Sequence, residues 1–233
     1  DRMMELRRGD WLPPGVLARL RQNLHDNIGR TLGMAAESVA IQRGFQEASV
    51  SYATLKGFSL CPGSVPKAEL RHQFDLDFLV AEEGADEARQ ILERRGYRLY
   101  AITGRSWEFK INEKPVVHLH DLYKDLPGRA VELHLEAKGG GRSGLLSRIE
   151  KRDFHGIQMP VLSPVDLFLS QGMPVYKHDF SEFSRASHLL EFRRHVLLRQ
   201  DDDAFWDGVR SAAVENPRAG LGLGVVTQLI TRT

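Results

Sequence analysis

The sequence has little cysteine, no long apolar run and almost no net charge, and each of these absences excludes a class of protein. Cys61 is the single cysteine among 233 residues, so the chain can form neither an internal disulfide nor a cysteine-based zinc site. A lone cysteine also fits a reducing compartment. No apolar run approaches the roughly 20 residues that a membrane span requires. We therefore expect a cytoplasmic protein without a membrane partner.

The sequence also lacks an excess of charge of either sign, because it contains 32 Lys and Arg residues and 31 Asp and Glu residues. This balance argues against an extended basic surface for nucleic acid. It does not exclude a compact site for one polyanionic ligand. The hydrophobic share of 42% and the charged share of 27% are typical of a globular protein.

The spacing of apolar residues divides the chain into three parts. Residues 15–49 have helical spacing, in stretches near 17–32 and 35–48, and residues 161–233 are helical again, with Gly172 and Pro174 expected to end the first of these helices. The part between them predicts strands at 50–55, 74–80, 107–111, 116–122 and 130–135, a helix at 86–95 and a short helix within 142–153. We expect an α+β fold with a mixed sheet, divided into a domain at 1–160 (its core at 50–160) and a helical domain at 161–233.

Asp75 and Asp77 are the strongest candidates for chemistry. Alternation along a strand places both carboxylates on one face, about 7 Å apart at the backbone. Two half-buried carboxylates repel each other unless a cation or a basic side chain neutralises them, and Mg²⁺ prefers oxygen ligands. The alternative is that one Asp caps a turn while the other is solvated.

Residues 55–60, Leu-Lys-Gly-Phe-Ser-Leu, place a glycine and a serine directly after a strand. Backbone N–H groups at such a turn can bind a phosphate, and Lys56 would add positive charge. An ordinary turn that needs Gly57 for its conformation is the alternative.

Glu132 and His134 share one face of the strand at 130–135, so Glu132 would be a third carboxylate if this strand lies beside Asp75 and Asp77. A solvent-facing Glu is the alternative. His118 and His120, with His134, also permit a zinc site, although isolated histidines on strands are mostly structural or exposed. The roles of these three histidines stay open.

Taken together, Leu55-Lys56-Gly57, Arg71 four residues before Asp75-Leu76-Asp77, and Val131-Glu132-Leu133-His134 resemble the DNA polymerase beta nucleotidyltransferase superfamily. More narrowly, the chain is similar to a bacterial nucleotidyltransferase-like group, well over residues 50–137. The resemblance implies a nucleotidyltransferase-type sheet flanked by helices, with a helical C-terminal domain.

The resemblance also implies roles for individual residues. Asp75, Asp77 and Glu132 would be the catalytic residues and would bind two Mg²⁺ ions, while Gly57 and Ser59 would contact phosphate oxygens and Lys56 and Arg71 would neutralise them. The implied reaction transfers NMP, with AMP expected, from an NTP such as ATP to an acceptor hydroxyl and releases pyrophosphate. The acceptor stays open between a small molecule, a protein side chain and an RNA end.

Two departures from the superfamily pattern keep alternatives open. Phe58 separates Gly57 from Ser59, and the segment from 57 to 75 is longer than usual. A catalytically inactive nucleotide-binding or regulatory module of the same fold is therefore the main alternative. A toxin-type nucleotidyltransferase would share the chemistry and differ in its acceptor.

Overall fold

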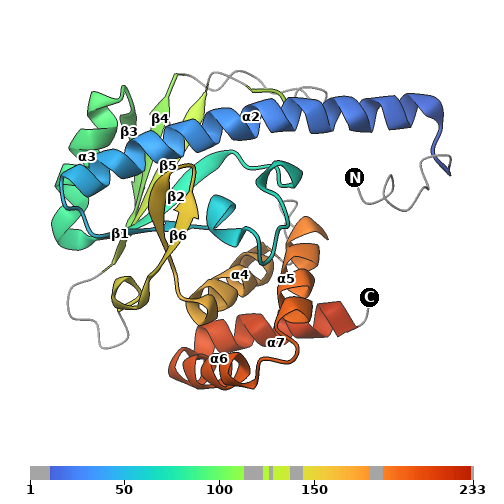
Figure 1. The fold of residues 1–233 in the computed structure, drawn as a ribbon. Coiled ribbons are helices and arrows are strands. Elements are labelled where there is room, and N and C mark those ends of the chain that lie inside the picture. Colours follow the sequence, from blue (N-terminus) through green and yellow to red (C-terminus); the bar gives the residue numbers. More distant parts are fainter. Residues whose placement is uncertain (1–10, 113–122, 126–127, 137–143, 179–185, 232–233) are drawn as a thin grey trace.

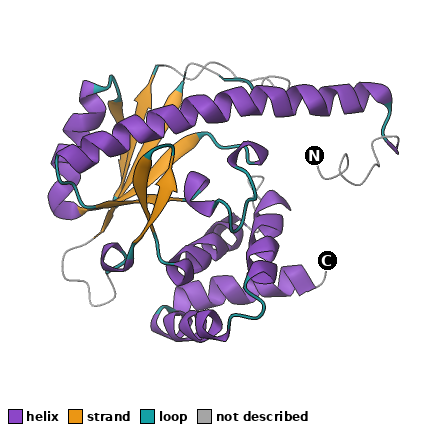
Figure 2. Ribbon diagram, in the orientation of Figure 1, coloured by secondary structure: helices purple, strands orange, loops and turns teal. Residues whose placement is uncertain are grey.

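The computed structural model describes residues 11–112, 123–125, 128–136, 144–178 and 186–231 (Figures 1 and 2). A long helix is followed by a sheet and then by a group of C-terminal helices. The helices are α2 (Pro14–Glu47), α3 (Ala85–Arg94), α4 (Pro164–His178), α5 (Ala186–Leu198), α6 (Asp203–Glu215) and α7 (Pro217–Thr231). The strands are β1 (Tyr52–Leu55), β2 (Asp75–Ala81), β3 (Arg98–Thr103), β4 (Ser106–Ile111), β5 (Arg129–Glu136), β6 (Glu150–Phe154) and β7 (Ile157–Val161). The expected α+β fold is confirmed.

The strands form one mixed sheet in the order β3-β4-β5-β2-β1-β7-β6. β2 lies at its centre, parallel to β5 and antiparallel to β1. Because side chains alternate along a strand, Leu76, Phe78 and Val80 of β2 face one side, where they join a core with α2 and α3. Asp75, Asp77 and Leu79 face the other side, and Leu79 packs there with Leu167 of α4. The two faces of β2 therefore separate the main core from the carboxylates.

The first long helix corrects the expectation of two separate stretches. α2 is continuous over 34 residues and lies across the sheet in Figure 1. Its buried face runs without interruption from Asn27 to Phe45. Packing against the sheet therefore stabilises the helix between the two stretches, where the apolar spacing changes.

The C-terminal helices pack around their own apolar cluster. It contains Phe168 and Leu169 from α4, Phe192 from α5, Phe205 and Val209 from α6, and Ala219 and Val226 from α7. The expected helix break at Gly172 and Pro174 is wrong, because α4 continues to His178. A Cβ on Gly172 would lie 3.4 Å from Leu223, so this glycine allows α7 to approach. The division into domains near residue 160 stays a prediction.

Three strands of the sheet, β3, β6 and β7, were not predicted from the sequence patterns. A short helix was expected within 142–153, where the structure has a single 3-10 turn at Leu146–Arg148 and then the start of β6. For β6 and β7 the reason lies in composition, because proline and charged residues are depleted in strands. β7 contains Pro160, and β6 contains four charged residues. The strand expected at 116–122 lies outside the described residues.

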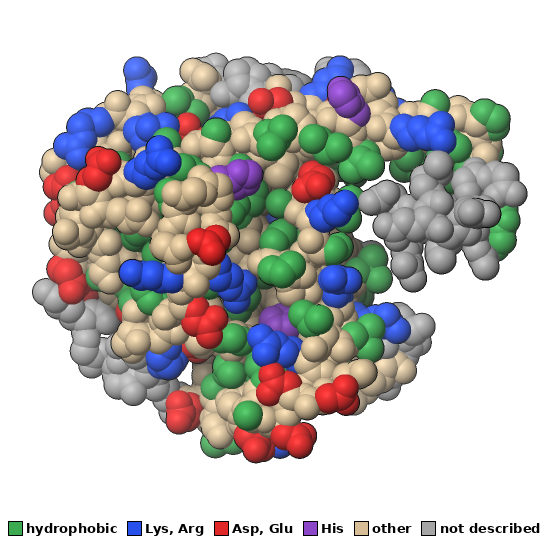
Figure 3. Space-filling model, in the orientation of Figure 1, with side chains coloured by type: hydrophobic (Ala, Val, Ile, Leu, Met, Phe, Trp, Pro, Cys, Tyr) green, Lys and Arg blue, Asp and Glu red, His purple; other side chains and the backbone are tan. Residues whose placement is uncertain are grey.

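Basic and acidic side chains of the described residues are interspersed over the face drawn in Figure 3, rather than gathered in one broad basic area. Within the described ranges, every helix is too short or too polar to cross a membrane.

Candidate active site

Asp75 and Asp77 lie on the same face of β2 but in different environments. Asp77 is buried, with 4% of its surface exposed, whereas Asp75 is exposed where the strand begins. Partial desolvation of its carboxylate and then the negative charge of Asp77 raise the pKa of Asp75. Asp77 therefore lies at the buried bottom of the site, and Asp75 lies at its solvent-exposed rim.

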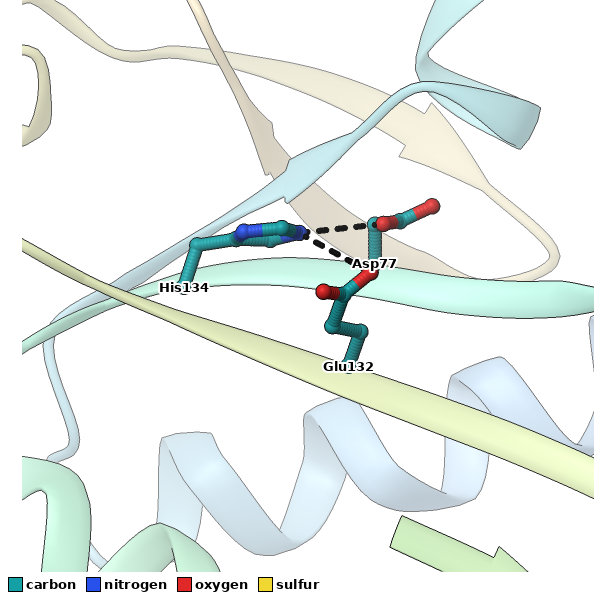
Figure 4. Close-up of side chains that lie close together, drawn as sticks. All are labelled: Asp77, Glu132 and His134. Carbon is teal, nitrogen blue, oxygen red and sulfur yellow. Dashed lines mark hydrogen bonds and ion pairs between the residues drawn. The ribbon is translucent and has the colours of Figure 1, made fainter. Parts of the chain in front are cut away.

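The pairing of β2 with β5 brings Glu132 to Asp77. The two residues are direct partners in the parallel register, although 55 positions separate them in the sequence. His134 follows on the same face of β5, and its Nε2 lies 3.1 Å from Asp77 Oδ1 and 3.5 Å from Glu132 Oε2 (Figure 4). The ligand atoms of Asp77, Glu132 and His134 all lie within 4.8 Å of one another. Asp75 is not part of this group.

Lys56 supplies positive charge to the same carboxylate. Its Nζ lies 2.7 Å from Asp77 Oδ1, and its side chain remains 45% exposed. Burial alone would raise the pKa of Asp77, but the hydrogen bond from His134 and the charge of Lys56 outweigh it and lower that pKa. Burial would likewise lower the pKa of Lys56, yet the charge of Asp77 raises it. Asp77 is thus held as a carboxylate and Lys56 as an ammonium.

The turn after β1 brings its backbone beside the two aspartates. Lys56 and Gly57 both have positive φ, of 49° and 41°, and a Cβ on Gly57 would lie 2.5 Å from Gln73 Oε1. A small hollow of about 10 Å³ touches Gly57, Gln73, Asp75 and Asp77. A strained turn next to grouped charges is typical of a functional site.

Phe58 and Ser59 both point into the protein from this turn. Phe58 is buried and packs against Phe154, with ring centroids 4.9 Å apart. Ser59 is also buried, and its hydroxyl donates to the carbonyl oxygen of Lys56 at 2.7 Å. Arg152 of β6 donates to the carbonyl oxygens of Ser59 and Cys61. Contacts with Phe154 and Arg152 therefore hold the turn on its buried side. In this conformation the Ser59 hydroxyl is used in a hydrogen bond to the backbone.

Arg71 connects the sheet region to the C-terminal helices. Its Nε lies 3.0 Å from Glu191 Oε1 of α5, and both side chains are largely buried. Beside this ion pair is a pocket of about 330 Å³, a size that suits a small ligand. Its lining comes from both regions: Leu70, Arg71, His72, Phe74, Tyr123, Ser187, His188 and Glu191.

Sequence reasoning missed one contributor to the site and left another undecided. Ser106 of β4 donates a hydrogen bond to Glu132 Oε1, and no sequence signal marked it. The sequence left the role of His134 open, as a neighbour of Glu132 or part of a zinc site, and the structure brings it into contact with Asp77. His118 and His120 lie outside the described residues.

The chemistry of this donor set fits a divalent cation. Two carboxylates and an imidazole converge from two strands, and Asp77 offers its oxygens from a rigid central strand. Glu132 and His134 are each about one-third exposed, so an ion from solvent can reach them.

Comparison with solved structures supports the fold. The antibiotic-resistance factor ANT(2'')-Ia, in its solution structure, is 11% identical, with a TM-score of 0.57 over 82% of this chain and 96% of that chain. The crystal structure of ANT(2'')-Ia with adenylyl-2''-tobramycin is 10% identical, with a TM-score of 0.57 over 78% of this chain and 98% of that chain. Identities this low show a common fold and nothing further.

Sequence comparison establishes the family. No curated protein sequence matches the chain. The profile of a family described as uncharacterised nucleotidyltransferase, however, matches residues 2–226, nearly the whole length. The chain therefore belongs to this nucleotidyltransferase family.

Proposed function

We propose that the protein transfers NMP, with AMP the expected group, from an NTP to an acceptor hydroxyl in a Mg²⁺-dependent reaction that releases pyrophosphate. Asp75, Asp77 and Glu132 are the proposed catalytic and metal-binding residues. The observation that carries this proposal is the register of β2 and β5, which places Glu132 directly beside buried Asp77. A buried carboxylate next to a second one is costly unless positive charge offsets it; Lys56 supplies one such charge, and a bound metal ion would supply more.

The reaction forms a bond between the acceptor oxygen and the α-phosphorus and breaks the bond between that phosphorus and the β-phosphate oxygen. Two Mg²⁺ ions would supply charge stabilisation for the attacking and leaving oxygens. Glu132, which is about one-third exposed and accepts a hydrogen bond from Ser106, would accept the proton of the acceptor hydroxyl. Asp77, fixed by Lys56 and His134, would keep its charge and orient the site.

On the phosphate side, the backbone at Gly57 and the ammonium of Lys56 would contact the triphosphate. Lys56 is exposed enough to exchange its contact with Asp77 for a phosphate oxygen. Arg71 would contribute charge from the edge of the larger pocket. For Ser59 to contact a phosphate through its hydroxyl, the hydrogen bond to Lys56 would have to open.

The pocket between the Arg71 segment and α5 would hold the part of the substrates beyond the reacting phosphate. Its aromatic side chains, His72, Phe74 and Tyr123, suit a flat or apolar group, and the ion pair of Arg71 and Glu191 suits a polar one. The adenylyl-tobramycin complex of ANT(2'')-Ia supports AMP as the group transferred and a small molecule as acceptor. A protein side chain or an RNA end remains an outcome of the acceptor assay.

A nucleotide-binding module without catalysis is the second candidate. The observation in its favour is Ser59, whose hydroxyl bonds to the backbone instead of facing the hollow near the aspartates. Buried Phe58 packs against Phe154 in the core, and it also lines the small hollow beside Gly57 and the aspartates.

Thermal unfolding with Mg²⁺ and each NTP tests the proposed site. A bound ligand raises the melting temperature by mass action, and we expect a rise that requires both metal and NTP. Asp75→Asn should abolish that rise, whereas Asp153→Asn, an exposed carboxylate change on β6, should retain it. If no NTP and metal shift the wild-type protein, the proposed site is wrong. If the shift occurs but no label moves from the NTP to any acceptor fraction, the non-catalytic candidate is correct.

A further inference from the structure

His134 occupies a position in the site that the proposed reaction does not require. The three carboxylates suffice for an all-oxygen metal site, yet an imidazole nitrogen lies in front of two candidate ligand oxygens (Figure 4). Its Nε2, rather than its Nδ1, is the atom that approaches both carboxylates.

The distances match those between neighbouring ligands of one metal ion. Metal–ligand bonds of about 2.1 Å at right angles place adjacent ligand atoms roughly 3 Å apart. Nε2 of His134 lies 3.1 Å from Asp77 Oδ1 and 3.5 Å from Glu132 Oε2. A small rotation of the partly exposed Glu132 side chain would shorten the second distance to about 3 Å.

From this geometry we infer that His134, in the tautomer that carries its proton on Nδ1, gives up its hydrogen bond to Asp77 and becomes a nitrogen ligand of the catalytic metal, so that the site binds a first-row transition ion such as Mn²⁺ more tightly than Mg²⁺. Imidazole nitrogen suits transition ions, whereas Mg²⁺ prefers oxygen ligands and keeps its waters. The inference rests on the proposed function, because it concerns the same metal site. Mg²⁺ still supports transfer, since the carboxylates remain available to it.

Lys56 sharpens the inference because its ammonium contacts the same Asp77 oxygen that faces His134. A cation that binds Oδ1 has to displace this ammonium. Lys56→Met should therefore raise Mn²⁺ affinity measured without nucleotide, while leaving the nitrogen ligand in place.

Electron paramagnetic resonance of Mn²⁺ in the untagged protein, in a nitrogen-free buffer and without nucleotide, tests the inference directly. We expect pulsed spectra to show nitrogen coupled to the bound ion, and labelling the histidines with ¹⁵N to change that coupling. His134→Gln should remove the coupling and weaken Mn²⁺ binding about 10-fold. Mg²⁺ binding should change far less. His25→Gln, which removes an exposed histidine on α2, should alter neither.

Three results would overturn the inference: bound Mn²⁺ without nitrogen coupling, a coupling that persists in His134→Gln, or equal loss of Mn²⁺ and Mg²⁺ affinity in that variant. These results leave the proposed function intact if label transfer from the NTP still occurs. Conversely, nitrogen-coupled Mn²⁺ in a protein that transfers no nucleotide would contradict the proposed function alone.

Discussion

The sheet and the C-terminal helices each bury an ionisable side chain, Asp77 in one and His195 in the other, and each is 4% exposed. Asp77 is surrounded by charge, with Lys56, His134 and Glu132 around it. His195 has neutral partners: its Nδ1 lies 2.7 Å from Gln171 Oε1 and 3.1 Å from Ser64 Oγ.

This difference indicates that Asp77 belongs to a functional site and His195 to a structural hydrogen-bond network. Burial and then the charges of Arg199 and Arg152 lower the pKa of His195 to about 4, so this ring is neutral near pH 7. Its Nδ1 has hydrogen-bond partners without any ion. Around Asp77, in contrast, three carboxylates lie near one ammonium and one imidazole, an arrangement that a divalent cation would stabilise. The predictions below test this contrast, from the largest effect to the smallest.

Asp77→Asn should have the largest effect on activity and a small effect on folding. The amide keeps the shape of Asp77 and removes its charge, so we expect nucleotidyl transfer to fall by at least about 100-fold. The melting temperature should change by only a few degrees, because the variant also relieves repulsion from Asp75. Transfer assays and thermal unfolding measure both quantities. Loss of folding instead of activity would show that the charge cluster is structural.

His195→Gln should show the opposite pattern, with lower stability and unchanged transfer. The ring stacks on Phe205 and contacts Phe168, so its loss should cost about 2 kcal/mol of unfolding free energy at pH 8. Transfer by the folded variant should match the wild type. A large loss of transfer would break the contrast between the two regions.

The same variant tests the pH dependence of stability. The folded pKa of about 4 lies below the ordinary 6.5, so the unfolded chain takes up the proton first as pH falls. The contribution of His195 is therefore complete above pH 6.5 and is lost between 6.5 and 4, up to about 3 kcal/mol. Denaturant unfolding across this range should show the wild-type advantage over His195→Gln shrinking as pH falls. A constant advantage would contradict a neutral buried ring.

Gly57→Ala should affect both stability and activity. A Cβ there would meet Gln73 Oε1 at 2.5 Å and would force a non-glycine residue to hold a φ of 41°. We expect a loss of about 1–2 kcal/mol and a transfer rate roughly 10-fold lower. Gly104→Ala is the matched control, since its φ is 59° and nothing lies within 4 Å of its Cβ. If both variants lose the same activity, the turn has no special role near the phosphates.

The ion pair of Arg71 and Glu191 should give the smallest change. A largely buried pair contributes about 1 kcal/mol, and Arg71→Gln and Glu191→Gln should cost similar amounts of stability. If Arg71 also contacts the triphosphate, only Arg71→Gln should raise the KM for the NTP severalfold. Equal KM values in the two variants would assign Arg71 to structure alone.

Local patterns sufficed for much of the fold and for the separate parts of the site. Alternation predicted β2 with Asp75 and Asp77 on one face. Contacts between distant segments decided the rest. The register of β2 with β5, the hydrogen bond from Ser106 and the continuity of α2 each depend on residues far apart in the sequence. No spacing rule encodes them.

Transfer of label from an NTP is the most direct test of the central claim. The protein, Mg²⁺ or Mn²⁺ and a cell extract would be incubated with ATP labelled at either the α or the γ phosphate, beside an Asp77→Asn control. The proposed function predicts that the α label becomes attached to an acceptor while the γ label leaves in pyrophosphate. The Asp77→Asn control should attach no α label to an acceptor and release no labelled pyrophosphate. Transfer of the γ label, or equal α transfer by Asp77→Asn, would contradict it.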